Sequence, residues 1–372
     1  RLCDPNYRVF FADGSRIDAT AHMARMIRQL ELFSGRDDAQ AFAVMMGELA
    51  DLYRASIDPF VRRNYDSPLD LVRPKAGMVA LKHGMLGNLA DGMKKRFRDP
   101  RLHALFCLQT MYLGLSPYEA PWVYGTLVYM EYGEGIWYPM GGMTLLSSEI
   151  AWLATERGAT IRLESPVSRI EGKRVVLASG ETIDADAVIC NADLPYAEKE
   201  LLRDPPPKDR RYSCSAHMLY LDYEGELPEM EHHNILLGAD FEGNLKQIFD
   251  EKRIPDDPAL YVQISGKTDP SKVKPGHLDV FLLIPCPNLD HPFTEADHET
   301  LMAKAFARLE KETSFRRENV RAMHVRDPHE WRSLLNLDKG ATFGLSHDFL
   351  QSVAFRPSNK SKKHPGLYFV GA

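Results

Sequence analysis

The chain has 372 residues, of which 44% are hydrophobic and 26% charged, a composition typical of a globular protein. Its length predicts two or three domains. The net charge of −6 gives no overall reason to expect nucleic acid as a partner. The five cysteines are odd in number and form no C-x-x-C pair, so we expect reduced thiols rather than a disulfide framework or a metal centre.

The first ten residues, RLCDPNYRVF, lack the apolar core of a signal peptide. Because the chain begins with Arg1 and not with methionine, we expect that further sequence precedes it. The most apolar stretches, residues 104–118 and 120–130, are interrupted by polar residues and proline. Neither reaches the roughly 18 uninterrupted apolar residues of a spanning helix, so no transmembrane segment is predicted.

The N-terminal quarter predicts a hairpin followed by helices. Residues 7–19 contain two short strand patterns joined at Asp13-Gly14, a dipeptide suited to a two-residue hairpin turn. Helices are expected at residues 20–33 and 37–56. Residues 67–131 are expected to be mostly helical with breaks at prolines, one helix beginning with Ser116 as N-cap and Pro117 at its first position.

Residues 71–101 contain eight lysines and arginines against two acidic residues, which is a local net charge of +6. Apolar residues alternate with these charges at helical spacing, a pattern typical of a helix that lies on anionic lipid. A solvated helix that packs on its own domain would show the same pattern. The residues expected to face a membrane are Lys94, Lys95, Arg96 and Arg98.

The stretch from residue 135 to 191 gives the clearest pattern. The sequence GIWYPMGGM leads into a helix with apolar residues on one face that closes at Arg157-Gly158. Strands are expected at residues 159–164 and after Ser165-Pro166, then a hairpin that turns at Ser179-Gly180 and a buried strand at residues 187–190. Further strands are expected at 217–223, 260–265, 278–285 and 367–370, and a helix at 296–311 with Thr294 as N-cap.

Several common catalytic motifs are absent from the sequence. The nearest approach to a G-x-G-x-x-G fingerprint is Gly133-Glu134-Gly135, with Tyr138 where the third glycine should stand. There is no phosphate-binding P-loop, no G-x-S-x-G elbow and no H-E-x-x-H. Adjacent His232 and His233 would point to opposite faces of a strand, so a solvated charged edge is favoured over a metal site.

GIWYPMGGM, the helix after it, GATIRLESPVSRI and ADAVICNAD together resemble the carotenoid (phytoene) desaturases within the flavin amine-oxidase-like superfamily. The final segment, GATFGLSHDFLQSVAFRPSNKSKKHPGLYFVGA, is the most specific part of a resemblance that covers nearly the whole chain in order. The resemblance implies an α/β (α+β mixed) flavoprotein of the two-dinucleotide-binding type. Its parts would be a partial Rossmann-like FAD domain, a substrate-binding mixed sheet and a helical, membrane-facing cap.

The same resemblance implies how the chain is divided. Because an N-terminal G-x-G-x-x-G and a flavin-binding tail are missing, we expect the chain to be a fragment that is inactive alone. The expected divisions are residues 1–134 as substrate-domain strands and helical cap (67–131 membrane-facing), 135–195 as a contribution to the FAD domain, 196–345 as substrate-binding sheet and helix, and 346–372 as the return strand to the FAD domain.

The implied activity is FAD-dependent desaturation of CH–CH groups in a membrane-dissolved carotenoid precursor such as phytoene, with quinone or oxygen as electron acceptor. The implied location is cytoplasmic and peripherally membrane-associated. The protein would mainly supply a dry, apolar tunnel that orients the substrate and excludes water, and no strongly perturbed acid–base pair is required. Carotenoid isomerase, ketolase or saturase activity, a flavin amine oxidase and a non-catalytic lipid-binding relative remain alternatives, and Met140 stands where some desaturases have a basic residue.

Five residues are expected to contact FAD. Two adjacent glycines before a helix allow a flat ligand close to the backbone, although a plain turn would need them equally. The resemblance places a valine at an adenine contact and the last two residues beside the pyrophosphate and ribitol; an ordinary core valine and a tight turn are the alternatives. These residues are Gly141, Gly142, Val167, Gly371 and Ala372.

A long hydrocarbon requires an apolar wall, and the region around Trp137, Tyr138 and Tyr132 is rich in aromatic residues. Core packing explains such residues as well. Asp99 and His103 lie four apart on an expected helix and share a face, where they could supply a base, or be solvated surface residues. No other residue is assigned a catalytic role from the sequence.

Overall fold

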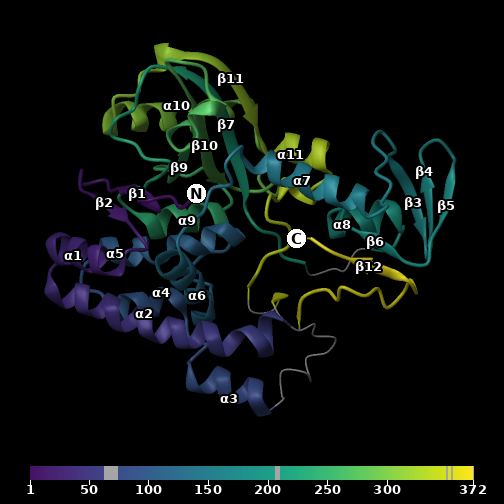
Figure 1. Cartoon of the computed structure of the whole chain (residues 1–372), viewed down its shortest axis with the longest axis horizontal. Coiled ribbons are helices and arrows are strands. Elements are labelled where there is room, and N and C mark those ends of the chain that lie inside the picture. Colours follow the sequence, from purple (N-terminus) through teal and green to yellow (C-terminus); the bar gives the residue numbers. More distant parts are fainter. Residues whose placement is uncertain (63–73, 206–209, 349–350, 353–354, 372) are drawn as a thin grey trace.

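The computed structural model describes residues 1–62, 74–205, 210–348, 351–352 and 355–371 of the chain. It has three parts: a large sheet, a helical lobe beneath that sheet, and a small α/β lobe to one side (Figure 1). The N-terminal strands belong to the large sheet, whereas the last strand belongs to the small lobe. This mixed α/β architecture is the expected fold class.

The large sheet has seven strands and joins segments that are far apart in the sequence. In spatial order these are β11 (Val320–Arg326), β7 (Ser215–Glu224), β10 (His277–Cys286), β9 (Leu260–Ile264), β8 (His233–Leu236), β1 (Tyr7–Phe10) and β2 (Arg16–Ala19). Neighbours are antiparallel except β1 and β8, which are parallel. The N-terminal hairpin thus extends a sheet built mainly from the third quarter of the chain.

The two faces of this sheet are covered differently. Along β10, Val280, Leu282 and Ile284 are fully buried, and they share a core with helix α10 (Glu295–Glu312). The residues between them alternate to the opposite face, as the two-residue period of a strand requires. Thr294 caps α10 in a reciprocal capping box with Asp297, as the sequence predicts. The opposite face is therefore free to border a pocket.

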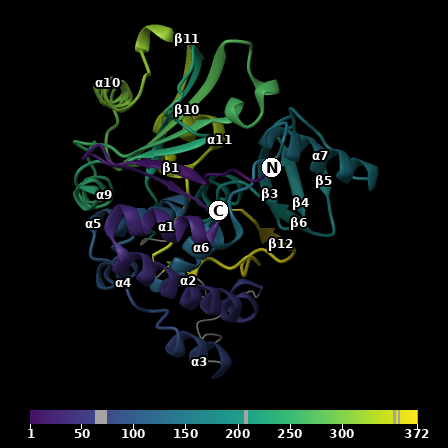
Figure 2. The ribbon, with the colours of Figure 1, turned by 60° about the vertical axis from the view of Figure 1, so that its left-hand side comes forward.

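The helical lobe lies on the other side of the sheet from α10, as Figures 1 and 2 show. It packs around a core of aromatic and aliphatic side chains. Its α-helices are α1 (Met23–Ser34), α2 (Arg36–Ser56), α3 (Pro74–Lys82), α4 (Leu89–Arg96), α5 (Pro100–Leu105) and α6 (Thr126–Tyr129). Shorter 3₁₀ or π turns are η1 (Ile57–Val61), η3 (Leu108–Leu113), η4 (Trp122–Gly125) and η5 (Met130–Glu134). Phe42, Phe106 and Tyr132 form a buried aromatic cluster at its centre.

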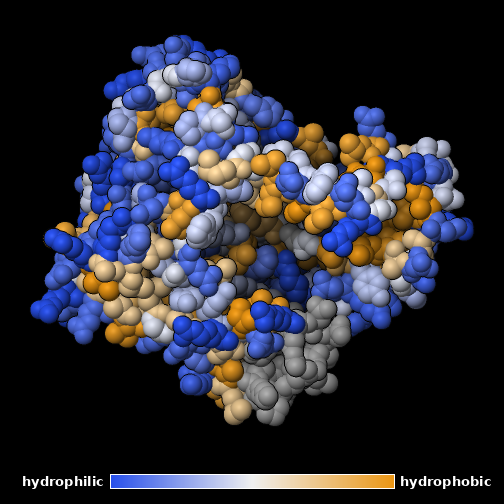
Figure 3. Space-filling model, in the orientation of Figure 1, coloured by the Kyte–Doolittle hydropathy of each residue, from blue (hydrophilic) through white to orange (hydrophobic). Residues whose placement is uncertain are grey.

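The small lobe contains the helix that follows GIWYPMGGM and two small sheets. Its elements are α7 (Met143–Glu156), β3 (Val167–Glu171), β4 (Arg174–Leu177), β5 (Thr182–Asp184), β6 (Val188–Cys190), α8 (Leu194–Tyr196), η6 (Ala197–Leu201) and β12 (Leu367–Phe369). β12 pairs with β6 in parallel, so the C-terminal strand returns to this lobe as expected. None of the residues of α7 is buried, and apolar side chains gather on the surface of this lobe (Figure 3).

Further helices connect these parts: α9 (Phe241–Phe249), α11 (Pro328–Leu335) and the short turns η7 (Ser265–Lys267), η8 (Pro270–Lys272), η9 (Arg317–Asn319) and η10 (Asp338–Gly340). Strands β8 and β11 and helices α9 and α11 did not appear among the sequence predictions. None of the helices in the described parts of the chain is long and apolar enough to cross a membrane.

Three local predictions are wrong. Residues 159–164 form no strand, because their alternating side chains find no neighbouring strand to pair with, and Leu163 is 82% exposed. Ser116-Pro117 begins a single turn and no helix. The last strand is only half-buried, since Leu367 is fully buried but Val370 is 45% exposed.

Candidate functional site

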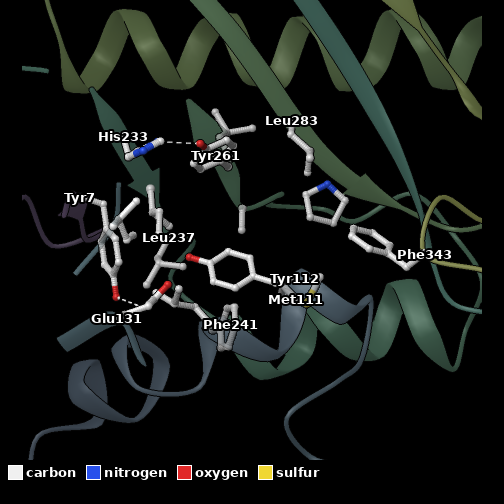
Figure 4. A pocket seen from close by; sticks show the side chains of 16 residues that line it. Tyr7, Met111, Tyr112, Glu131, His233, Leu237, Phe241, Tyr261, Leu283 and Phe343 are labelled. Atoms are coloured by element: carbon white, nitrogen blue, oxygen red, sulfur yellow. Dashed lines mark hydrogen bonds between the residues drawn. The ribbon is translucent and has the colours of Figure 1, made fainter. Parts of the chain in front are cut away.

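An apolar pocket of about 460 Å³ lies between the uncovered face of the large sheet and the helical lobe. Figure 4 shows its side chains converging from β1, β8, β9 and β10 above and from η3, η5 and α9 below. It is lined by Tyr7, Leu108, Met111, Tyr112, Glu131, Ile136, His233, Ile235, Leu237, Phe241, Ala259, Leu260, Tyr261, Leu283, Pro285 and Phe343. Nearly all of these groups are hydrocarbon, so the pocket suits a ligand that is held by shape and apolar contact.

One carboxylate, Glu131 on η5, breaks this apolar lining. Its Oε2 accepts hydrogen bonds from the Tyr7 hydroxyl at 3.0 Å and from Nε2 of Gln109 at 2.9 Å. The Tyr7 hydroxyl is also 2.9 Å from that of Tyr132. Glu131 is only 7% exposed. Burial raises the pKa of Glu131, and hydrogen bonding from Tyr112, Gln109 and Tyr7 opposes this shift only in part.

His233 lines the same pocket on the sheet side, where its Nδ1 is 2.7 Å from the Tyr261 hydroxyl. Burial, with the neighbouring His232 adding to it, lowers the pKa of His233 to about 3. The ring is therefore neutral at physiological pH, and it adds a hydrogen-bonding edge without a charge. Glu131 is the carboxylate of the pocket lining, and no lysine or arginine is among the lining residues.

The interpretation of His232 and His233 as a solvated edge is wrong. His232 is 4% exposed, and its ring nitrogens are 2.6 Å from the Thr268 hydroxyl and 3.1 Å from the Gln263 amide. Strand β8 begins at His233, so the two rings do not alternate across a strand, and their centres lie 4.2 Å apart. Burial lowers the pKa of His232.

Cys3 joins this pair, and the three potential ligand atoms lie within 4.8 Å of one another. Both nitrogens of His232 already have hydrogen-bond partners, and burial raises the pKa of the Cys3 thiol. A metal-binding cysteine must lose its proton, which this environment opposes. The hydrogen-bonded network accounts for the cluster, and the expectation of no metal site stays a prediction.

The two glycines expected at FAD adopt the left-handed backbone that favours glycine, with φ of +91° at Gly141 and +87° at Gly142. The amide of Gly141 donates to Oδ2 of Asp269 at 2.7 Å, and its carbonyl accepts from Nζ of Lys272 at 2.8 Å. This fastens the turn to the large-sheet part of the chain. A Cβ added at Gly142 would be in ordinary contact with the Tyr138 hydroxyl at 3.5 Å, whereas one added at Gly141 would lie 2.5 Å from Cδ2 of Leu145.

Gly371 follows β12 with φ of +96°, and an added Cβ would lie 2.5 Å from Oδ1 of Asn191. Gly371 and Asn191 thus meet where the parallel strands β12 and β6 end, the edge at which α/β sheets bind ligands. Val167 begins β3, pairs with Leu177 and is half-buried. Ala372 lies outside the described residues. These positions fit a cofactor at the small lobe, and their contacts with FAD stay predictions.

The aromatic residues expected to border the substrate do not line the pocket. Tyr132 is fully buried in the core of the helical lobe and reaches the pocket only through Tyr7. Tyr138 is buried against His232, with ring centres 4.8 Å apart. Trp137 is 66% exposed, and its Nε1 donates to the carbonyl of Glu134. Their role in binding substrate stays a prediction.

Asp99 and His103 also lie apart from the pocket. Asp99 is the N-cap of α5 and pairs with Arg101 at 2.6 Å. Burial would raise the pKa of Asp99, but the hydrogen bonds and charge of Arg101 outweigh it and lower the pKa. Nε2 of His103 is 2.8 Å from the carbonyl of Phe97. Both side chains therefore stabilise the start of α5, and the structure offers neither as a base in the pocket.

The basic residues expected at a membrane are engaged in ion pairs. Lys94 pairs with Glu242 at 2.9 Å, Arg96 with Glu48 at 2.6 Å and Arg98 with Asp37 at 2.6 Å. The side chain of Lys95 is exposed. The apolar residues of α4 are buried in the helical lobe, so this helix packs on its own domain. Exposed apolar side chains instead lie on and just after α3, at Met78, Leu81 and Leu86.

Comparisons with known proteins first identify the class of protein to which this chain belongs. The pattern of the flavin containing amine oxidoreductases matches residues 3–372 of this chain. Among solved structures, an oxidoreductase from Methanosarcina mazei covers 98% of this chain and 74% of its own, with a TM-score of 0.60 and 15% identity. A putrescine oxidase variant gives a TM-score of 0.58 over the same shares, with 12% identity. These structures share the fold, and the chain belongs to the flavin containing amine oxidoreductase family.

The sequence relatives narrow this to the carotenoid desaturase branch. A zeta-carotene-forming phytoene desaturase of Myxococcus xanthus is 38% identical over all of this chain and 74% of its own length. A phytoene desaturase of Phycomyces blakesleeanus is 32% identical over all of this chain and 67% of its own length. The family resemblance and FAD as the cofactor, both expected from the sequence, are confirmed.

Sequence reasoning missed the polar groups of the pocket, Tyr7, Tyr112, Glu131 and Tyr261. One signal was present: Glu131 directly follows the apolar run at residues 120–130, where a lone acid is out of place unless it is solvated or used. The tyrosines carried no such signal. Their convergence depends on β1, β9 and η3 meeting in three dimensions.

Proposed function

We propose that this protein, with FAD bound, introduces double bonds into a long hydrocarbon carotenoid precursor such as phytoene. The observation that carries this proposal is the apolar pocket of about 460 Å³ in a chain similar to phytoene desaturases over its full length. A polyene offers no charge or hydrogen-bonding group, so only an apolar, shaped cavity can select it.

The residues of this chain would divide the task between the lobes. FAD, when bound, supplies the acceptor for a hydride, and quinone or oxygen would reoxidise it. Gly141, Gly142, Val167 and Gly371 would hold the flavin through backbone contacts in the small lobe and at its border. The pocket would orient the hydrocarbon and exclude water from the reacting carbons.

Incubation of the full-length protein with FAD and with phytoene in liposomes tests this proposal. We expect the absorption of the carotenoid to move to longer wavelength, because each new double bond extends the conjugated polyene. Chromatography of the extracted pigments would show whether double bonds were added, isomerised, oxygenated or saturated. Hydrogen peroxide formed from a primary amine such as putrescine, without any change in phytoene, would contradict the proposal and support an amine oxidase.

We also propose that the protein attaches peripherally to the cytoplasmic face of a membrane, where its substrate dissolves. The supporting observation is the tip formed by α3 and the residues after it, which Figure 1 shows at the edge of the helical lobe. Leu81 and Leu86 are 83% and 68% exposed there. Apolar side chains at such a tip can enter the interface of a bilayer.

Replacing Leu81 and Leu86 together by serine should weaken sedimentation with anionic liposomes roughly tenfold or more, because each buried leucine contributes about 1.5–3 kcal/mol. Leu32→Ser is a matched control, since Leu32 is 82% exposed but lies on α1. Its binding should equal that of the unchanged protein. Equal binding of the double variant would remove α3 and its following loop as the contact.

A further inference from the structure

Glu131 presents one unsatisfied carboxylate oxygen in the apolar pocket. Its Oε2 is held by Tyr7 and Gln109, whereas Oε1 has no hydrogen-bond partner of good geometry among the described residues, although the nearby Tyr112 hydroxyl lowers the pKa of Glu131. Figure 4 shows the side chain between Tyr7 and Tyr112 in the pocket wall. Leaving a buried polar atom without a partner is unfavourable. The fold therefore retains an acidic group at a position where it lowers stability.

Packing alone does not explain a carboxyl group here. Glutamine has nearly the same volume and would fill the same space without a charge to desolvate. What glutamate adds is the capacity to take up a proton. His233 also lines the pocket and has a basic nitrogen. It is a much weaker base than the Glu131 carboxylate, because its pKa is lowered to about 3.

We propose that Glu131 is the catalytic base of the desaturation and accepts, at Oε1, the proton that the hydrocarbon loses. This inference rests on the proposed function. FAD, when bound, would supply the acceptor for the hydride that leaves with the electron pair of one C–H bond. The neighbouring C–H bond breaks with its proton passing to Oε1, and the electrons of that bond form the new C=C bond. The substrate is oxidised by two electrons, which quinone or oxygen finally receives with the proton.

The groups around Glu131 suit this role. The titratable side chains that face it are Tyr7, Tyr132, Tyr112 and Tyr261, which come from β1, η5, η3 and β9. Burial of the hydroxyl groups raises the pKa of each phenol, although the Tyr112 residue as a whole is 47% exposed, so all four stay neutral in the physiological range. Among the described residues, none of the groups that set the pKa of Glu131 is a cation. The carboxylate is thus more basic than a solvated glutamate.

The pH dependence has a definite sign. Glu131 can accept a proton only when it is ionised, so turnover should fall as the pH drops through its pKa. Because that pKa is raised, the acid limb should lie above the usual glutamate value of about 4.3. The surrounding phenols titrate far above this range and should not contribute to the limb.

Glu131→Gln and Glu131→Asp in the full-length, FAD-bound protein test this assignment with phytoene in liposomes. We expect Glu131→Gln to bind phytoene and FAD normally but to lose roughly a hundredfold in turnover, in line with the usual contribution of a general base. Its acid limb should disappear. Glu131→Asp should keep the acid limb with a smaller loss, because the carboxylate remains but is one methylene further back. Glu134→Gln, on the exposed end of the same η5 turn, is the matched control and should be unchanged.

A second measurement does not depend on turnover. A pH titration followed by infrared spectroscopy should show a protonated carboxyl band, with a raised midpoint, that is missing in Glu131→Gln. Normal turnover of Glu131→Gln, or an unchanged acid limb, would overturn the assignment. Equal loss of phytoene binding and turnover would show a structural role and overturn it too. Failure of the unchanged protein to convert any carotenoid would count against the proposed function, while the infrared titration would still report on Glu131.

Discussion

Leu283→Trp is expected to reduce kcat/KM for phytoene by roughly a hundredfold while the protein stays folded. Leu283 lies on β10, and its side chain points into the pocket (Figure 4), opposite to the core residues Leu282 and Ile284. A tryptophan there would occupy space that the hydrocarbon needs, and small displacements of a bound reactant can cost about that factor. The α10 core would not be touched, because it packs on the other face of the sheet.

The measurement is steady-state desaturation together with the midpoint of chemical unfolding. Met323→Trp is a suitable control, because Met323 is 44% exposed on the edge strand β11, away from the pocket. It should leave both quantities nearly unchanged. If Leu283→Trp turned phytoene over at the normal rate, the substrate would have to bind elsewhere, and the pocket between sheet and helical lobe would lose its proposed role.

Gly340→Ala is expected to have the largest effect on stability, a loss of about 3 kcal/mol or more, from strain of about 1–2 kcal/mol and overpacking of about 1–3 kcal/mol. Gly340 has φ of +59°, and an added Cβ would lie 2.1 Å from the carbonyl oxygen of Pro328 at the start of α11. That neighbour is backbone and cannot rotate away. Any shift would also disturb the 2.6 Å hydrogen bond from the Ser215 hydroxyl to the Gly340 carbonyl.

Gly276→Ala separates the two causes of this loss. Gly276 also has a positive φ, +78°, but an added Cβ would meet no atom within 4 Å. We expect only the backbone strain, about 1–2 kcal/mol, from this change. Urea unfolding of both variants would measure the difference. Similar losses in the two variants would mean that the close approach of α11 to Gly340 does not limit the packing there.

The sequence predicted well wherever short-range physics decides the outcome. The hairpin of residues 7–19, the capped helix α10 and the long strands β7 and β10 follow from turn residues, an N-cap threonine and apolar alternation, although the hairpin loop has three residues, 12–14, and not the expected two-residue turn at Asp13-Gly14. Prediction failed where the structure of a segment depends on a neighbouring segment that is distant in the sequence. Residues 159–164 alternate like a strand but pair with none of the described strands, and a strand without a ladder leaves its backbone groups unpaired.

The candidate site divides in the same way. Gly141, Gly142 and Gly371 could be singled out because a positive φ and close approach leave a mark in the sequence, namely glycine beside a helix or strand end. Lys94, Arg96 and Arg98 pair with Glu242, Glu48 and Asp37, which are distant in the sequence, and their contact with a membrane stays a prediction. Charge patterning counts charges but does not show which of them are paired.

The sequence by itself determined the family, the cofactor, the mixed α/β class and most of the strands and helices, because these depend on local patterns and on a resemblance spread along the whole chain. The tertiary structure alone decided where the pocket lies and that Glu131 and His233 share it. The physical reason is desolvation: it acts on a side chain through whatever surrounds it in space. The neighbours of Glu131 come from segments up to about 130 residues away, so no local window of the sequence contains them.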